Sequence, residues 1–164
     1  RDLITYKQAA YYAQSTNMGG GLRDAIDLLD DHLRVGARPA IVFMTDGNSN
    51  TIDAGEDTDL PDDWDWDALF DYNGDGNGDY YTSNTQKRYI LKLAAEAIGK
   101  GYTLHGIAIG QDADNELLAG IAHMGGGEYL HVPGGTSVTE MQAQIEAAYY
   151  KIASLVPPAQ LLKE

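Results

Sequence analysis

A short apolar run followed by an acid constrains the fold of this chain most. Residues 40–44 read Ala-Ile-Val-Phe-Met, and Thr45, Asp46 and Gly47 follow directly. A continuous apolar run of this length is typical of a strand that is buried on both faces, as in a parallel sheet covered by helices. Such sheets bind ligands just beyond the carboxyl ends of their strands, which is where Asp46 falls. An ordinary Asp-Gly turn is the alternative that this stretch alone leaves open.

Helical and strand-like patterns alternate through the rest of the 164-residue chain, which is long enough for one domain with a real core. Apolar spacing, caps and glycine stops predict helices over residues 4–14, 22–33, 85–101 and 138–155. A further helix is expected to start after a cap at Asp112 or Asp114 and to end at residues 125–127. Strands are expected over 102–109 and 128–132, and residues 159–162 form a short strand or a tail. This order predicts an α/β fold, a Rossmann-like, doubly wound, mostly parallel sheet with helices on both faces, in a single domain spanning 1–164.

An acidic insert at about 47–82 interrupts this alternation. The chain has a net charge of −14, and nearly half of its 25 acidic residues lie between Arg38 and Lys87, where there is no Lys or Arg. Loops this long in a compact domain are usually functional or disordered. Four large side chains favour an insert that is anchored to the body of the domain: Trp64, Trp66, Leu69 and Phe70.

Composition and charge exclude several classes of function. The acidity argues against nucleic acid as a partner, because phosphate binding needs basic patches. No apolar run reaches the length of a membrane span, and the absence of cysteine excludes disulfides and thiolate metal sites. No Ser lies in a nucleophile motif, and the four histidines lack metal-ligand spacing, so we expect a protein that is not an enzyme.

Residues 71–79 resemble the calcium loop of EF-hands and related Asp-rich repeats, because oxygen-bearing side chains recur at every second position around Gly76. On that template the first three ligands are Asp71, Asn73 and Asp75. Asn77 offers its backbone carbonyl, and Asp79 binds directly or through a water. This resemblance implies a Ca²⁺ site of low affinity, with a Kd on the order of 10⁻⁴–10⁻³ M, which suits extracellular calcium.

The loop departs from the EF-hand template in two ways. Thr82 occupies the last position, where a bidentate acid is normal, and the flanking sequence does not predict the two EF-hand helices. Asp65 or Asp67 could supply the missing ligand. The alternative interpretation is a flexible turn rich in Gly, Asn and Asp.

Several segments in order resemble the second half of a von Willebrand factor A domain. They are residues 16–26 (Thr-Asn-Met-Gly-Gly-Gly-Leu-Arg-Asp-Ala-Ile), 41–47 (Ile-Val-Phe-Met-Thr-Asp-Gly), 106–110 with 115–122, and 126–129. The likeness covers nearly everything except the insert and the last few residues. It implies that domain's fold and a metal-ion-dependent adhesion site, in which Thr16 offers its hydroxyl to Mg²⁺ or a similar ion and Asp46 reaches the ion directly or through a water. An open coordination position would then take a carboxylate from a protein partner.

One part of the family's site is missing from these residues. The Asp-x-Ser-x-Ser loop, which follows the first strand of the family, does not occur, and Arg1 rather than Met begins the sequence. We therefore expect a piece of a longer chain, whose first strand and metal loop lie upstream or in a companion chain. The alternatives are a site that has lost its function, or Thr16 capping the helix that follows and Asp46 binding loop amides.

The resulting prediction is a non-enzymatic, divalent-metal-dependent adhesion module, extracellular or on the cell surface, with a calcium-stabilised insert. A structural component of a surface filament or envelope complex is the main alternative. A domain of a metal-chelatase accessory subunit is disfavoured by the calcium-like loop, because cytosolic calcium is scarce. Residues 44–48 are faintly similar to the signature of haloacid-dehalogenase-like phosphatases, but Met44 stands where the nucleophile is needed.

Overall fold

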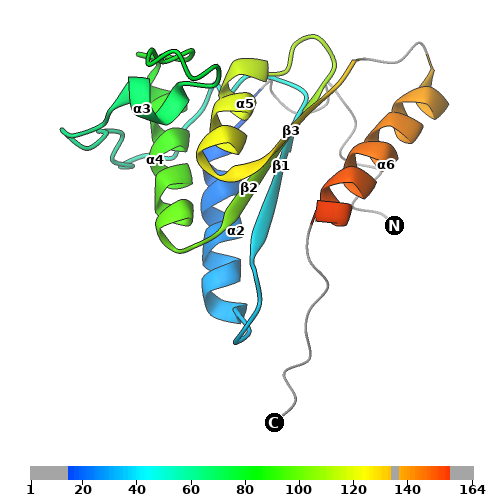
Figure 1. The fold of residues 1–164 in the computed structure, drawn as a ribbon, viewed down its shortest axis with the longest axis horizontal. Helices are drawn as coiled ribbons and strands as arrows, with labels where there is room; N and C mark the ends of the chain where they lie inside the picture. Colours follow the sequence, from blue (N-terminus) through cyan, green and yellow to red (C-terminus); the bar gives the residue numbers. More distant parts are fainter. Residues whose placement is uncertain (1–14, 134–136, 156–164) are drawn as a thin grey trace.

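The computed structural model describes residues 15–133 and 137–155, and it has a mixed α/β architecture (Figure 1). The elements are α2 (Met18–His32), β1 (Ala40–Thr45), α3 (Trp66–Phe70), α4 (Thr85–Gly99), β2 (Thr103–Ile109), α5 (Asn115–Met124), β3 (Gly126–Val132) and α6 (Val138–Leu155). The helix expected over 4–14 and the segment 159–162 lie outside the described residues.

The three strands form one parallel sheet in the order β1-β2-β3. Ala40 pairs with Thr103 and Thr45 with Ala108, so β1 and β2 are in register over the whole of β1. Helices α2, α4 and α5 lie on one side of the sheet and α6 lies on the other (Figure 1). The α/β class, the parallel sheet and the helices on both faces are therefore as predicted, and the expected first strand is not among the described residues.

Two apolar layers hold the helices against the sheet. The larger one joins α2, α4 and α5 to the sheet through fully buried side chains, among them Leu22, Ile26, Leu91, Leu104, Leu117 and Ile121. The smaller one packs Ala148 and Ile152 of α6 against Ile107 and Val132. No helix in the described ranges is long and apolar enough to cross a membrane.

Two glycines allow the close packing around β2. A Cβ atom on Gly106 would lie 2.8 Å from the Leu118 carbonyl oxygen, and one on Gly127 would lie 1.9 Å from the Leu104 carbonyl oxygen. Both positions therefore exclude any other residue unless the backbone shifts.

Several element boundaries differ from the sequence prediction, among them the end of α4 at Gly99 and the start of β2 at Thr103. Helix α2 begins at Met18 and so includes Gly19–Gly21, because the Asn17 side chain caps it. It ends at His32, and Leu33 is 50 % exposed instead of facing the core. Strand β3 begins at Gly126, two residues earlier than expected.

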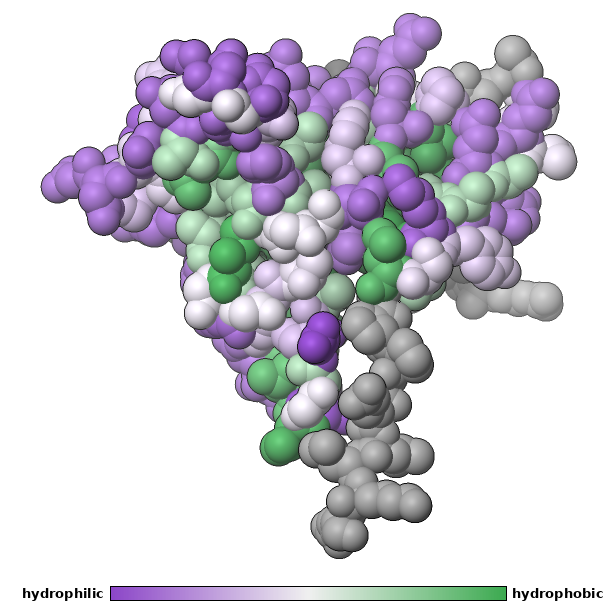
Figure 2. All heavy atoms as spheres, in the orientation of Figure 1, coloured by the Kyte–Doolittle hydropathy of each residue, from purple (hydrophilic) through white to green (hydrophobic). Residues whose placement is uncertain are grey.

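The insert is anchored by its aromatic residues, as predicted. Phe70 is fully buried, and the rings of Trp64 and Trp66 pack beside it, with the Trp66 and Phe70 centroids 5.3 Å apart. The short helix α3 within this segment was not predicted; its first turn is capped by Asp65, which accepts a hydrogen bond from Ala68 N. The outer surface over this region is strongly hydrophilic (Figure 2).

A buried histidine satisfies the backbone at an irregularity of the sheet. The register of β2 and β3 shifts between Leu104 and Gly106. There His105, only 3 % exposed, accepts a hydrogen bond at Nδ1 from the Glu128 N–H at 3.0 Å. An Nδ1 atom that accepts must be unprotonated, and burial lowers the pKa of His105 despite the nearby Glu128 carboxylate.

Neutral His105 gives the fold a stability that depends on pH. The pKa of His105 is lower in the folded state than in the unfolded chain, where it is about 6.5. The contribution of His105 to folding stability is therefore complete at a pH above the unfolded pKa, and it is lost as the pH falls through the folded pKa. Urea unfolding between pH 7.5 and 5.5 is expected to show falling stability, and His105→Asn, which keeps an acceptor, is expected to flatten this slope. The same exchange at exposed His32 is the control; an equal effect of both substitutions would contradict the role of His105.

Candidate functional site

The segment that carries Thr16 is tied to the loop after β1. Thr16 N donates a hydrogen bond to Asn50 Oδ1 at 2.7 Å, and the Thr16 carbonyl accepts from Asn50 N at 3.1 Å. The same carbonyl accepts longer bonds from Thr51 N and Ser49 Oγ. These contacts hold Thr16 at the carboxyl end of β1 through its backbone atoms, and none of them involves its side chain.

Asp46 lies at the same edge of the sheet. Thr45 Oγ1 accepts from Gly47 N at 3.2 Å and donates to Gly47 O at 3.1 Å, which fixes the turn on which Asp46 sits. A methyl group added at Gly47 would lie 3.7 Å from Thr16 Oγ1, so the two loops meet here. Asp46 is exposed, and neither its carboxylate nor the Thr16 hydroxyl forms a hydrogen bond with another described residue.

This arrangement disagrees with the purely structural interpretation of the two residues. The cap of α2 is Asn17, whose Oδ1 accepts from Gly20 N at 2.9 Å, and not Thr16. The Asp46 carboxylate binds no loop amide among the described residues, since Thr45 makes the turn's bonds. A third loop reaches the same edge, where Asn48 Nδ2 donates to the Asp112 carbonyl at 3.0 Å.

Asp71 organises the loop at 71–79 from its first position. Its Oδ1 accepts from Gly74 N and Asp75 N, and its Oδ2 accepts from Gly76 N at 2.8 Å. Gly74 and Gly76 have φ values of +77° and +86°, which favour glycine over any residue with a side chain. The chain is therefore wound around one carboxylate, that of the residue predicted as the first calcium ligand.

The other predicted ligands are joined in the same loop. Asn73 Oδ1 accepts from Asp75 N at 2.8 Å, and Asp75 Oδ1 accepts from Asn77 N at 2.9 Å. Asp79 closes the loop, because its Oδ2 accepts from Tyr72 N at 2.8 Å and its Oδ1 from Asn73 Nδ2 at 3.1 Å. The bonds from Asn77 lower the pKa of the exposed Asp75 carboxyl. The structure thus brings all five predicted loop residues together.

The surroundings of the loop correct and sharpen the sequence prediction. Helix α3, of five residues, ends at Phe70 directly before Asp71, and α4 begins at Thr85, six residues after Asp79. Asp67 touches the loop, accepting from Gly78 N at 2.9 Å, whereas Asp65 is the cap of α3. Thr82 is buried and accepts from Asn84 N. Of these two acids, Asp67 is the one that contacts the loop.

Carboxylates alone do not form a metal-binding group in the described ranges. Within residues 15–133 and 137–155, no three Asp, Glu or His side chains converge in a way that would hold an ion. The loop's proposed donors also include Asn side chains and a backbone carbonyl, and the edge of the sheet offers a hydroxyl. The two sets of predicted ligands lie in separate loops, the first at 71–79 and the second beside β1.

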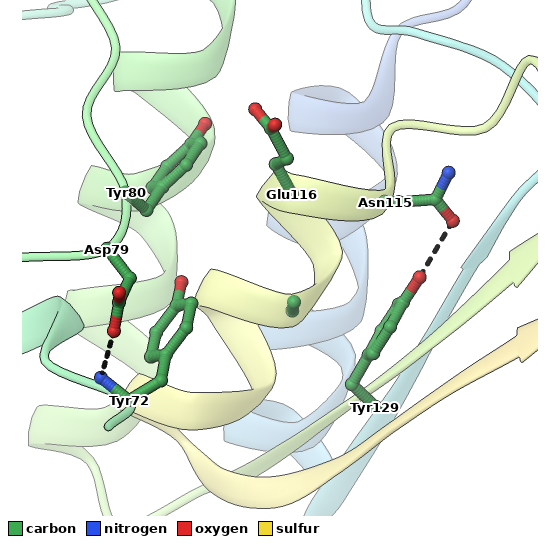
Figure 3. Close-up of a pocket in the computed structure, with 7 residues that line it drawn as sticks. Tyr72, Asp79, Tyr80, Asn115, Glu116 and Tyr129 are labelled. Carbon is green, nitrogen blue, oxygen red and sulfur yellow. Dashed lines mark hydrogen bonds between the residues drawn. The ribbon is translucent and has the colours of Figure 1, made fainter. Parts of the chain in front are cut away.

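A pocket of about 250 Å³ beside the loop was not predicted (Figure 3). Its floor is the first turns of α5, and its walls are tyrosine rings from the insert and from β3. The lining residues are Tyr72, Asp79, Tyr80, Asn115, Glu116, Ala119 and Tyr129. The sequence carried no signal that would bring residues 72, 116 and 129 together.

No protein-family model matches the chain, and no curated protein matches it.

Removing the hydroxyl of Thr16 tests whether it has a structural role. Because Asn17 provides the cap and Thr16 is held by its backbone, Thr16→Val is expected to change the free energy of unfolding by less than about 0.5 kcal/mol. Asn17→Ala is the comparison, and losing that cap is expected to cost about 1 kcal/mol. Urea denaturation measures both, and a loss at Thr16 as large as that at Asn17 would show that its hydroxyl stabilises the fold.

Proposed function

We propose that this chain is part of a divalent-metal-dependent protein-binding module of the von Willebrand A type, which acts at the cell surface or outside the cell. The observation that carries the proposal is the meeting of Thr16 and Asp46 at the carboxyl edge of a parallel sheet, with a hydroxyl and a carboxylate that no described residue uses. Ligand sites of open α/β sheets lie at this edge.

The donor chemistry at the edge suits a hard divalent cation. Mg²⁺ takes oxygen ligands in octahedral geometry and keeps several waters, so one hydroxyl and one carboxylate are compatible with part of its shell. When bound, the ion would attract a carboxylate of a protein partner across a surface that is otherwise strongly negative. Thr16 would offer its oxygen and Asp46 would balance the charge of the ion.

Two side chains do not complete such a site. The remaining ligands are assigned in this proposal to an Asp-x-Ser-x-Ser loop upstream of Arg1 or in a companion chain. The parallel arrangement supports a strand next to β1 as the carrier of that loop, because strands of a parallel sheet all bring their carboxyl ends to one edge. Thr16 and Asp46 would then face the new loop from the side of β1.

The insert is proposed to bind Ca²⁺ through Asp71, Asn73, Asp75, Asn77 and Asp79. The hydrogen bonds from backbone N–H groups leave lone pairs on the same carboxylates for an ion. Asp67, next to Gly78, is the nearest further acid. A cation in the loop would offset negative charge in a segment that has no Lys or Arg. Extracellular calcium, at millimolar concentration, would occupy a site with a Kd on the order of 10⁻⁴–10⁻³ M.

Calcium is expected to stabilise the chain through the loop. At 10 mM Ca²⁺ and a Kd between 10⁻⁴ and 10⁻³ M, mass action gives about 1.4–2.7 kcal/mol, which raises the melting temperature by roughly 3–10 °C. Asp71→Ala is expected to remove this rise. Asp62→Ala, an equal change of charge at an exposed insert residue, is the matched control and should keep it. Calorimetry measures both, and no response of the unaltered chain would overturn the calcium proposal.

The metal edge is tested on the protein together with the segment that completes it. The experiment uses the protein with that segment present and with Asp71→Ala, which removes the proposed loop site for the ion. In this background Asp46→Ala is expected to weaken Mn²⁺ binding by about tenfold or more, measured by electron paramagnetic resonance. Asp31→Ala on α2 is the charge-matched control. Equal binding by both variants, or the absence of Asp-x-Ser-x-Ser from the upstream sequence and from any companion, would end the adhesion-site proposal.

A further inference from the structure

The unpredicted pocket between the insert and α5 combines aromatic walls with negative charge. Tyr72 and Tyr80 lie on one side and Tyr129 lies on the other, while Glu116 extends from the first turn of α5 at the upper margin of the view (Figure 3). Ala119 gives the floor an apolar surface. Because the ring faces of tyrosine attract cations, three such rings beside a carboxylate form a surface suited to positive charge.

The walls of the pocket are held in place by contacts outside it. Tyr129 Oη donates to Asn115 Oδ1 at 2.7 Å, which fixes the ring from β3 against α5. Tyr72 packs edge-on against Phe70, its ring centroid 6.5 Å away, and against the ring of His123 at 4.7 Å. Tyr80 is only 5 % exposed, and its ring centroid lies 5.3 Å from that of Phe70. The cage is therefore formed before any ligand binds.

The local charge is negative and is not neutralised within the pocket. Asp79 and Glu116 both line it. The nearest base of α4, Lys87, is paired with the buried Asp114 at 2.8 Å. The Asp79 carboxylate is occupied by Tyr72 N and Asn73, so exposed Glu116 is the carboxylate left to meet a ligand.

Size limits what can enter. The volume of about 250 Å³ lies below the usual range for drug-sized ligands, and it suits a single long side chain. Arginine fits this chemistry best, because its planar guanidinium stacks on tyrosine rings while its N–H groups form a fork toward a carboxylate, and its aliphatic stem can cover apolar floor.

We propose that the pocket lined by Tyr72, Tyr80, Tyr129 and Glu116 binds an arginine side chain of a partner protein. The guanidinium stacks on the faces of the tyrosine rings, and the Glu116 carboxylate pairs with its positive charge. The inference goes beyond the metal edge, since it needs neither Thr16 nor Asp46. The partner would contribute an arginine here, in addition to the carboxylate that a metal would take.

The test uses N-acetyl-L-arginine amide as the probe and follows the amide resonances of the ¹⁵N-labelled chain by NMR, in constant Ca²⁺. Saturable shifts are expected at residues around the pocket, and the blocked citrulline analogue, which has the same shape without the charge, is expected to bind at least about tenfold more weakly. Blocked lysine is expected to bind more weakly than arginine. Equal binding of arginine and citrulline would overturn the proposal.

Matched variants locate the binding. Glu116→Gln is expected to weaken arginine binding about threefold to tenfold, and Glu146→Gln on the opposite side of the sheet, which makes the same chemical change, is expected to leave it unaltered. Tyr72→Phe keeps a ring face and is expected to retain binding, while Tyr72→Leu is expected to lose it. Equal effects at Glu116 and Glu146 would overturn the assignment. Asp46→Ala should leave arginine binding unchanged, so failure of the metal proposal and failure of this one are distinguishable.

Discussion

The burial of β2 on both faces is the constraint on which the rest of the structure depends. Leu104 and Ile107 are fully shielded, and β2 lies between two strands as well as between helices. A strand in that position can only be followed by chain that leaves at its carboxyl end and returns through a helix on the outside. The loops after β1 and β2 consequently meet at one edge, where Asn48 binds the Asp112 carbonyl. The position of Asp46 follows from this packing.

The structure of the insert depends on how its negative charge is offset, whereas the structure of the sheet depends on burial. The segment has no base of its own, and Lys92 of α4 offsets part of its charge by pairing with Asp57 and donating to the Asp57 carbonyl as well. Aromatic burial around Phe70 supplies the attractive contacts, and backbone N–H groups bonded to Asp71 and Asp79 partly satisfy the carboxylates. Each of these partners is fixed in place, which gives an acidic segment a definite shape without a hydrophobic core of its own.

The sequence was sufficient for features that depend on spacing and insufficient for those that depend on tertiary contacts. The helix stripes gave the layers correctly, since burial selects periodic patterns directly. The apolar run at 40–44 does form a strand, but the expectation that it is buried on both faces was wrong for the described residues, because β1 is an edge strand there and Met44 is 43 % exposed. Thr16 and Asn17 are both reasonable caps by composition, and only the fold decides that Asn17 takes this role. Helix α3 has five residues, too few for a periodic signal. The tyrosine pocket joins residues from three elements, which no local pattern records.

The loop and the pocket share a wall, and this makes their chemistry interdependent. Tyr72 N is held by the Asp79 carboxylate inside the loop, while the Tyr72 ring faces the pocket (Figure 3). A cation that draws the Asp79 carboxylate toward the loop interior would compete with its hydrogen bond from Tyr72 N. The backbone that carries the Tyr72 ring would then shift. A guanidinium bound as proposed would contact the same Tyr72 ring. Since coupling between two ligands is reciprocal, a calcium ion that improves arginine binding must be bound more tightly in the presence of arginine by the same factor.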